Sequence, residues 1–334
     1  MGDIEDEANE PPEPIGSAWS SLLDFADRYR TLGFGPLADQ LRGGGPPLPP
    51  LRGTPVIIDT DIGGDPDDAI AVTCAARGVP ELALVLTADE NHGQRARFAR
   101  HVLDLHGRAE VPVVAGADLG NIRYYCVEDL IPPDIPGQRD DPIAAVRAVC
   151  AATDGPVRWV GMGPLTNLAR ILDAAPELAP RLVITQMGGA IAYRDPAKAE
   201  HNFRLDPAAA SFVVGHAVHL FLMLSDTTFT PEIEIDRDSE LYKRLAATDA
   251  PEWARLLATH LDNWFDRFYP GTRQHDPLTL TAALQLPFVD FARRAIVLGD
   301  DARMRVDPRG RSVRASSRAD YAAFRAWLAG QLDY

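Results

Sequence analysis

The chain has 334 residues, of which 46% are hydrophobic, and this is enough to build one large α/β core. It carries 33 lysine and arginine residues against 48 aspartate and glutamate residues, a formal net charge of −15 at pH 7. Such an acidic chain is a poor partner for nucleic acid or for an anionic membrane, which leaves small molecules and cations as ligands.

Three features of the sequence predict a cytoplasmic protein. The amino terminus has no basic region followed by an apolar core, as a signal peptide would. No apolar run reaches the ~18 residues that a membrane span needs. Cys74, Cys126 and Cys150 are odd in number and form no Cys-x-x-Cys pair, so we expect neither a disulfide framework nor a zinc site.

The first 53 residues are predicted to be an extension that precedes the catalytic domain. Their start, up to about residue 15, is polar and rich in proline, which is typical of disorder. Between Ser17 and Leu32, apolar residues recur at helical spacing and predict a helix with one apolar face. The glycine and proline run from Gly43 to Pro50 predicts a linker.

Strand and helix patterns alternate from residue 54 to residue 334, which is typical of α/β proteins with right-handed crossovers. We therefore expect an open, mostly parallel, Rossmann-like sheet flanked by helices. The strands are predicted near residues 55–58, 82–87, 111–115, 157–161, 181–186 and 218–224.

Five aspartates follow the first predicted strand in quick succession: Asp59, Asp61, Asp65, Asp67 and Asp68. Carboxylates this close repel one another, so they either hold protons or gather around a cation. Capping of the next helix would explain one aspartate but not five. Oxygen ligands favour a hard ion, so the loop predicts a Ca²⁺ or Mg²⁺ site.

Two other aspartate motifs fit less well. An EF-hand loop that began at Asp59 would need Asp or Asn at its fifth position and Glu at its twelfth, where Gly63 and Ile70 stand. A Mg²⁺-dependent phosphatase of the haloacid dehalogenase type would need a lysine at the site. Because Lys198 and Lys243 do not follow apolar strand runs, the phosphatase is kept as the weaker alternative.

Further motifs come later in the chain. In order with the aspartate loop, they are Gly163-Pro164-Leu165-Thr166-Asn167, Met187-Gly188-Gly189-Ala190, Glu200-His201-Asn202 ahead of Asp206-Pro207, and His275-Asp276-Pro277-Leu278. The series resembles the nucleoside hydrolase family of the inosine-uridine preferring type, over about residues 54 to 330.

The resemblance implies Ca²⁺-dependent hydrolysis of the N-glycosidic bond of ribonucleosides, which releases ribose and free base. It assigns the ion to Asp61, Asp68, the main-chain carbonyl of Met162 and Asp276. Asp61 is also expected to be the general base that takes a proton from water. His275 is expected to help the base to leave.

Other positions are assigned to the substrate by the same resemblance. Asp67, Asn91, Glu200 and Asn202 are expected to bind the ribose, with an offset of one or two residues left open for Asn91. Glu200 and Asn202 lie two apart, so in an extended segment both side chains would point the same way. Trp264, from an aromatic-rich helical stretch, is expected to flank the base.

The chain departs from the family pattern at three places. His201 stands where the family has another aromatic residue. Arg194 lies in the segment where relatives often carry a Gly-Asn pair that contacts the 5′-hydroxyl, so it is a candidate to bind an unusual group at the 5′ position of the substrate. The aspartate loop is longer than usual, which makes Asp65 extra.

Two expectations concern the whole protein. One is that the chain forms a homodimer or homotetramer, as its relatives commonly do. The alternative to the enzyme is a protein of the same fold that binds a nucleoside or a ribosylated metabolite without cleaving it.

Overall fold

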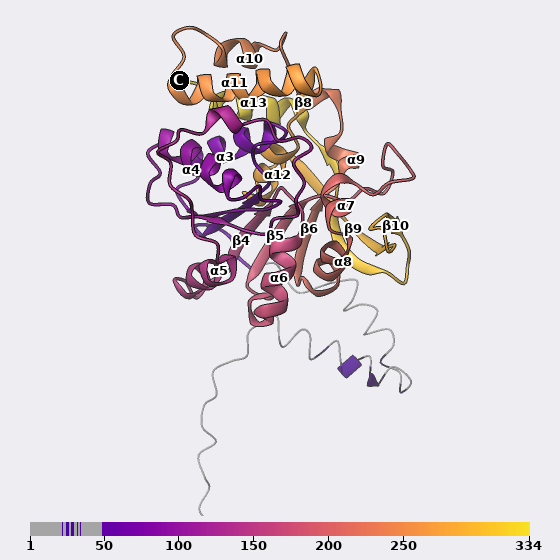
Figure 1. The fold of residues 1–334 in the computed structure, drawn as a ribbon. Coiled ribbons are helices and arrows are strands. Elements are labelled where there is room, and N and C mark those ends of the chain that lie inside the picture. Colours follow the sequence, from indigo (N-terminus) through magenta and orange to yellow (C-terminus); the bar gives the residue numbers. More distant parts are fainter. Residues whose placement is uncertain (1–21, 23–24, 27, 30–31, 33, 35–48) are drawn as a thin grey trace, which may run out of the picture. The chain divides into compact units, whose positions relative to one another are not determined.

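The computed structural model describes residues 49–334 and, ahead of them, only residues 22, 25, 26, 28, 29, 32 and 34 (Figure 1). The chain separates into two compact units, Met1–Leu48 and Pro49–Tyr334. In the first unit, Leu22, Phe25, Ala26 and Arg28 are helical. The rest of the predicted amphipathic helix, the acidic tail and the linker up to residue 48 lie outside the described residues.

A nine-stranded sheet forms the centre of the second unit, in the order β10-β9-β11-β6-β5-β4-β1-β2-β3. The six strands from β6 to β3 pair in parallel, which confirms the predicted open, mostly parallel α/β sheet. They are β1 (Val56–Thr60), β2 (Leu82–Thr87), β3 (Val113–Ala115), β4 (Val157–Gly161), β5 (Leu182–Met187) and β6 (His219–Met223).

Three carboxy-terminal strands that the sequence did not predict extend the sheet at one edge. They are β9 (Val289–Leu298), β10 (Met304–Val306) and β11 (Arg311–Ala319). β9 pairs antiparallel with both β10 and β11, and β11 lies parallel to β6. Their exposed positions are rich in arginine, so they lack the continuous apolar run that marks the inner strands.

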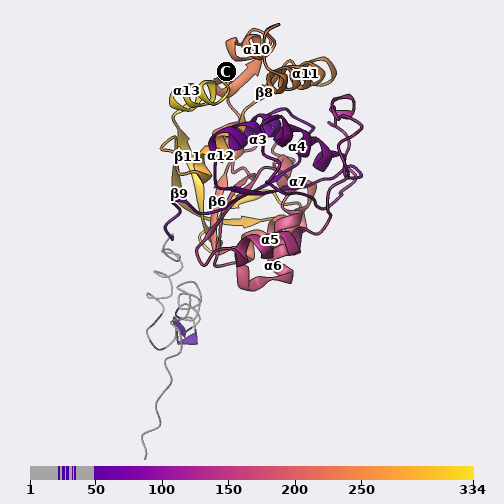
Figure 2. The same ribbon diagram turned by 90° about the vertical axis from the view of Figure 1, so that its left-hand side faces the viewer.

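Helices cover both faces of the sheet (Figures 1 and 2). Neighbouring residues of β1 show this, because Ile57 packs in one apolar core and Ile58 in the other. One face carries α5 (Pro142–Ala151), α6 (Thr166–Ala174) and α8 (Pro207–His216). The other carries α3 (Asp67–Gly78), α4 (Gln94–Leu105), α11 (Glu252–Arg267), α12 (His275–Ala283) and α13 (Tyr321–Gln331).

Shorter elements complete the unit. They are helices α7 (His201–Leu205), α9 (Ser225–Thr228) and α10 (Glu240–Leu245), the 3-10 turns η2 (Glu128–Leu130), η3 (Pro176–Leu178) and η4 (Pro231–Ile233), and a two-stranded sheet of β7 (Glu234–Asp236) and β8 (Gly271–Arg273). In the described part of the chain, no helix combines the length and apolar character that a bilayer crossing requires.

The parallel register brings the carboxyl ends of the inner strands together on one side of the sheet. Thr60 lies beside Thr87, Gly161 beside Gln186, and Met187 beside Met223. The segments that follow these residues must therefore meet, as ligand sites in open α/β sheets do.

Candidate active site

A cavity of about 500 Å³ opens at the carboxyl ends of the inner strands. This size is typical of sites for small molecules. Its wall combines carboxylates, arginines and aromatic rings. The carboxylates are Asp61, Asp65, Asp67, Asp68, Asp89, Glu200, Glu234 and Asp276, and the arginines are Arg95, Arg194, Arg204 and Arg273.

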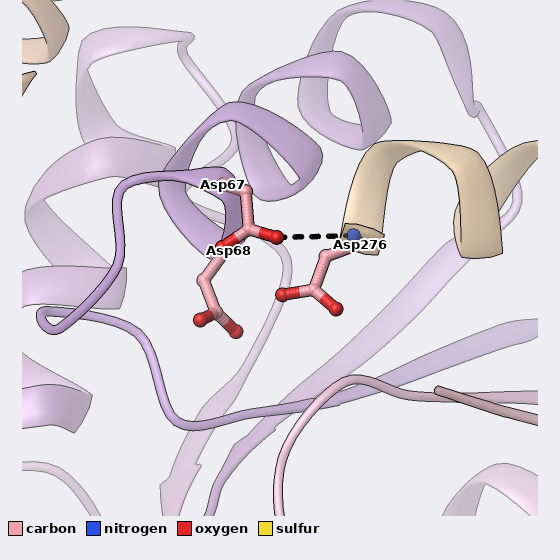
Figure 3. A group of neighbouring side chains, drawn as sticks. All are labelled: Asp67, Asp68 and Asp276. Carbon is pink, nitrogen blue, oxygen red and sulfur yellow. Dashed lines mark hydrogen bonds between the residues drawn. The ribbon is translucent and has the colours of Figure 1, made fainter. Parts of the chain in front are cut away.

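Three buried carboxylates form a cluster that could hold a metal ion (Figure 3). Asp67 and Asp68 begin α3, and Asp276 lies in the first turn of α12. One oxygen from each of the three lies within 4.8 Å of the others. In addition, the main-chain N–H of Asp276 donates to Oδ2 of Asp67 at 3.2 Å. Two helix starts that are far apart in the sequence thus meet at this cluster.

The electrostatics of the cluster favour a cation. Burial first, and neighbouring aspartates second, raise the pKa of Asp67, Asp68 and Asp276 well above the usual range of a carboxyl group. A divalent ion would remove the repulsion that causes part of this rise. All three ligands are carboxylate oxygens, so the donor set fits a hard ion such as Ca²⁺ or Mg²⁺.

The predicted metal ligands all line the cavity, but they do not all belong to the three-carboxylate cluster. Asp68 and Asp276 belong to the three-carboxylate cluster, whose third member is Asp67, a residue predicted to bind ribose. Asp61 lines the same cavity but stands outside this cluster. Met162 also lines the cavity, and its carbonyl accepts a hydrogen bond from Nδ2 of Asn202 at 2.6 Å. A carbonyl oxygen has a second lone pair, so coordination remains open to it.

Asp59 does not belong with the other aspartates. β1 continues to Thr60, so Asp59 is a buried strand residue that does not line the cavity. Its Oδ1 accepts a hydrogen bond from Nδ2 of Asn167 at 2.8 Å, and burial raises its pKa to about 8. The prediction of five carboxylates in one loop is therefore corrected: the loop itself holds Asp61 and Asp65, whereas Asp59 lies in β1, which is longer than its apolar run suggested, and the last two aspartates begin α3.

Asn167 is a structural residue whose role the sequence did not reveal. Besides Asp59, it donates to the carbonyl of Thr87 at 3.0 Å and accepts from the N–H of Ala117 at 2.9 Å. Its amide thus ties together β1, β2 and the segment after β3.

The longer aspartate loop also has a defined place. Asp65 lines the cavity and accepts a hydrogen bond from the hydroxyl of Thr272 in β8. Burial is the main cause that raises its pKa, to about 7. The extra residue therefore joins the loop to the small β7–β8 sheet.

After β2, the cavity is lined by Asp89 and not by the predicted Asn91. Asp89 has a positive φ of 49°, which turns the chain directly after the strand. Oδ2 of this residue accepts from Nδ2 of Asn121 at 2.9 Å, while Oδ1 is buried without a hydrogen-bond partner in the described structure. Because this turn is tight, Asn91 lies beyond the cavity wall, two residues further on.

Glu200 and Asn202 both line the cavity, but not from an extended segment. Glu200 is the N-cap of α7, and its carboxylate accepts from the N–H groups of Phe203 at 3.3 Å and Gly189 at 3.0 Å. Asn202 lies inside α7. The prediction of a strand-like segment was wrong because a glutamate followed by main-chain donors can cap a short helix.

Gly188 is needed where the end of β5 approaches this cap. Its φ is +153°, and a Cβ atom there would lie 2.8 Å from the ring of Phe203 and 3.3 Å from Oε2 of Glu200. The Gly-Gly motif thus lets the main chain come close to α7.

His275 lines the cavity at the start of α12, and its Nδ1 lies 2.7 Å from Oγ1 of Thr228. Burial, followed by the nearby Arg273 and Arg194, lowers its pKa to about 3. The imidazole is therefore neutral near pH 7. A histidine with such a pKa can help a leaving group as a neutral N–H donor.

Aromatic side chains form another part of the wall. Trp264 lines the cavity as expected, and its ring centroid lies 5.8 Å from that of Tyr124 and 5.7 Å from that of Tyr269. His201 lies 6.2 Å from Tyr124 by the same measure. Tyr269 belongs to the same aromatic-rich stretch as Trp264, whereas Tyr124 comes from a segment with no motif, so only the structure reveals Tyr124.

The two lysines lie outside the cavity wall. Lys198 pairs with Asp195 at 3.0 Å, and Lys243 pairs with Glu240 at 2.9 Å. The site therefore lacks the lysine that a phosphatase of the haloacid dehalogenase type would need.

Comparisons with known proteins agree with this geometry. Residues 56–326 match the family model described as inosine-uridine preferring nucleoside hydrolase. The chain is 28% identical over 252 residues to the pyrimidine-specific ribonucleoside hydrolase RihA of Escherichia coli O81 (strain ED1a), a match that covers 69% of this chain and 79% of the relative. It is 30% identical over 255 residues to RihA of Enterobacter sp. (strain 638), with the same coverage.

Solved structures share the fold. The inosine-uridine preferring nucleoside hydrolase from Bacillus anthracis superposes with a TM-score of 0.69 at 18% identity, which covers 84% of this chain and 99% of that one. The purine-preferring ribonucleoside hydrolase from Gardnerella vaginalis also has a TM-score of 0.69, at 20% identity, covering 84% and 98%.

Proposed function

This chain belongs to the inosine-uridine preferring nucleoside hydrolase family, enzymes that cleave the N-glycosidic bond of ribonucleosides, and we propose that its own reaction depends on Ca²⁺. The observation that best supports a metal is the buried cluster of Asp67, Asp68 and Asp276. Three buried carboxylates with raised pKa in the wall of one cavity favour a cation beside them, because the ion offsets the cost of keeping them charged. Ca²⁺ suits flexible carboxylate and carbonyl ligands better than the strictly octahedral Mg²⁺ does.

The residues that would hold the ion are Asp68 and Asp276. Further ligands in the same cavity would be Asp61, Asp67 and the Met162 carbonyl. When bound, the ion supplies Lewis-acid chemistry that makes a water molecule at the site more acidic. The remaining chemistry falls to the side chains of the chain itself.

Asp61 is proposed as the general base. It lies in the cavity wall, outside the three-carboxylate cluster, so one of its oxygens can face a water molecule. Arg95 donates a hydrogen bond to the main-chain carbonyl of Asp61 and a second one, at 3.0 Å, to that of Ile62, which fixes the loop that carries the base. A carboxylate so held can take the proton as the water attacks the anomeric carbon.

Ribose binding is proposed for Glu200, Asn202 and Asp89, with Asp67 close by. Glu200 keeps acceptor capacity while it caps α7, and the free Oδ1 of Asp89 is an acceptor that a sugar hydroxyl could satisfy. Such contacts would stabilise the oxocarbenium-like transition state, as they do in glycoside hydrolysis. Asp89 takes the place that the resemblance assigned to Asn91.

His275 is proposed to assist the departing base as a neutral donor. If the hydroxyl of Thr228 donates to Nδ1, the ring proton is left on Nε2, where it can hydrogen-bond to the base. Trp264, with Tyr124, offers aromatic surface against the base. The curated relatives described above are named pyrimidine-specific, and the two solved structures are named inosine-uridine preferring and purine-preferring. Purine and pyrimidine nucleosides are therefore both candidate substrates.

Two further proposals concern the setting. The described cysteines are all free and buried, which supports a reducing compartment such as the cytoplasm. A homodimer or homotetramer is proposed from the resemblance, and light scattering of the purified chain would test it.

The decisive experiment measures reducing sugar released from a panel of purine and pyrimidine nucleosides. The enzyme is first treated with a chelator and then supplied with Ca²⁺ or Mg²⁺. We expect release of ribose that is lost on chelation and restored best by Ca²⁺. Tight binding of nucleosides without ribose release would instead support the non-catalytic binding protein. Restoration by Mg²⁺ alone would refute the choice of ion.

A further inference from the structure

Arg194 stands on a loop whose position is fixed by hydrogen bonds. The loop runs from the end of β5 to the start of α7. The carboxylate of Asp226 in α9 accepts from the N–H of Ile191 at 2.9 Å and from that of Ala192 at 2.8 Å. These bonds set the main chain just before Arg194 and direct the loop along the rim of the cavity, which Tyr193 and Arg194 line.

The guanidinium of Arg194 has no hydrogen bond or ion pair with any residue that the structure describes. The neighbouring Asp195 does not neutralise it, because that carboxylate pairs with Lys198 at 3.0 Å. Arg194 instead lies over aromatic rings, 4.4 Å from the centroid of Phe229 and 4.8 Å from that of Tyr193. Its charge and its donors therefore remain available to a ligand.

A second guanidinium lies against the same phenyl ring. Arg273, from β8, is 3.9 Å from the centroid of Phe229 and pairs with Glu234 at 2.8 Å. Its Nε is buried and has no partner in the described structure. Phe229 also stacks on His275, at 6.3 Å and 17°. The two arginines thus stand at the reacting end of the cavity, beside the proposed leaving-group residue.

The other two arginines of the cavity are already engaged. Arg95 donates to main-chain carbonyls, among them that of Asp89 at 2.6 Å. Arg204 donates to the carbonyl of Ala199 at 2.8 Å and lies 3.2 Å from Nδ1 of His201. Among the four arginines of the cavity wall, Arg194 is therefore the one whose donors are free, and Arg273, which pairs with Glu234, lies beside it against Phe229.

We propose that the substrate is a nucleoside with an anionic group, a phosphate on the ribose or a carboxylate on the base, which Arg194 binds with support from Arg273. The proposal rests on the proposed function, since it takes the nucleoside as given. A guanidinium presents two parallel donors that match carboxylate and phosphate oxygens, and it binds them more strongly than it binds a neutral hydroxyl. A neutral nucleoside would leave these donors unused.

Carboxylates outnumber arginines in the cavity wall, so electrostatics alone would repel an anion. Recognition must therefore come from direct contact with the guanidinium groups at Phe229. Binding that depends on such contact should weaken as salt rises, but less steeply than attraction by the whole protein field would.

The test compares neutral and anionic substrates of the intact enzyme with Ca²⁺ present. The substrates are inosine and inosine 5′-monophosphate, uridine and uridine 5′-monophosphate, and orotidine, which is uridine with a carboxylate on the base. Release of the free base is followed by chromatography. Arg194→Gln is set against Arg123→Gln, because Arg123 also lies over a tyrosine, 5.0 Å from the ring of Tyr124, but stands outside the cavity wall.

We expect the wild type to have a higher kcat/KM for at least one anionic substrate than for its neutral parent. Arg194→Gln should lower this ratio about 10- to 100-fold, the size of a charge-assisted contact, whereas Arg123→Gln should leave it unchanged. A preference for the phosphates would place the anion on the ribose, and a preference for orotidine would place it on the base.

Hydrolysis of neutral nucleosides without preference for any anionic one would overturn the inference and leave the proposed function standing. Equal effects of the two substitutions on the ratio would overturn it as well. If no substrate is cleaved, the proposed function fails, and calorimetric binding of the same compounds to the wild type and to Arg194→Gln decides the inference separately.

Discussion

The main-chain N–H of Asp276 donates a hydrogen bond to the carboxylate of Asp67 at 3.2 Å, although the two residues lie far apart in the sequence. This bond joins the first turns of α3 and α12 at the point where the carboxylates gather (Figure 3). The same contact that assembles the cluster also brings negative charges together, so the stability of the domain should depend on the ion.

The first prediction concerns that dependence. Adding Ca²⁺ to the chelated protein should raise the melting temperature, and a hundredfold excess over the dissociation constant corresponds to about 2.7 kcal/mol. Asp276→Asn should melt at a higher temperature than the wild type when both are free of metal, because one repelling carboxylate is gone. It should gain less from added Ca²⁺. Melting curves that do not respond to chelation in the wild type would contradict the metal site.

The second prediction concerns the general base. Asp61→Asn keeps the shape of the side chain but removes the proton acceptor, so kcat should fall by about 10²–10⁴-fold. Bound Ca²⁺, measured by atomic spectroscopy, and the circular dichroism spectrum show whether the site and the fold persist. Near-normal turnover in a metal-loaded variant would rule Asp61 out as the base.

The third prediction concerns His275. A purine or pyrimidine leaves poorly as an anion, whereas nitrophenolate leaves without help. His275→Ala should therefore slow the hydrolysis of natural nucleosides much more than that of a nitrophenyl riboside, by up to about 10²–10⁴-fold for a positioned donor.

Thr228→Val provides a graded comparison for this experiment. It removes the hydroxyl that lies 2.7 Å from Nδ1 of His275 and leaves the imidazole in place. The natural substrates should be affected in the same direction but less. Equal losses on both substrate types for His275→Ala would mean that the side chain shapes the cavity and does not donate a proton or hydrogen bond.

The fourth prediction concerns pH and stability. Burial lowers the pKa of His219 and of His106 to about 4 in the folded protein. The unfolded chain binds protons at these residues near pH 6.5, so it holds more protons than the native state between pH 6.5 and 4. The contribution of these two histidines to the free energy of unfolding should therefore be constant above this range and fall as the pH drops through it.

Urea unfolding at a series of pH values measures this slope, which is at most about 1.4 kcal/mol per pH unit for each such histidine. His219→Phe should lose less stability than the wild type as the pH drops from 6.5 to 4, because the contribution of His219 is gone. His92→Gln is the control, since the side chain of His92 is 90% exposed. An unchanged slope in His219→Phe would show that other groups govern the acid stability.

The inner half of the fold could be predicted from the sequence, and the reasons lie in particular residues. The strands β1, β2 and β4 to β6 are short apolar runs followed by turn residues, because both faces of the sheet are buried. By contrast, β9 and β11 lie at the edge, where Arg294 and Arg318 can face solvent, and their sequence resembles a polar loop.

Residues of the candidate site could be predicted where they belong to a sequence motif. They were missed where only the three-dimensional path of the chain brings them to the cavity. Asp68, Asp276 and Glu200 belong to motifs, and all three reach the cavity. Asp89 instead reaches the cavity wall because it has a positive φ directly after β2. Tyr124 reaches the wall through the path of a loop that has no regular sequence pattern. Neither leaves a periodic trace in the sequence. The pKa of His275 depends on burial first and also on Arg194, both of which only tertiary structure provides.

The parallel pairing of β11 with β6 has a consequence for biosynthesis. A ribosome delivers the chain from the amino terminus, so β6 is made long before residues 311–319 emerge. Until then, the growing sheet ends at β6 with a row of unpaired main-chain donors and acceptors. Such an open edge recruits strands from other chains. Nascent or truncated chains that end before β11 should therefore need a chaperone more than the finished protein does.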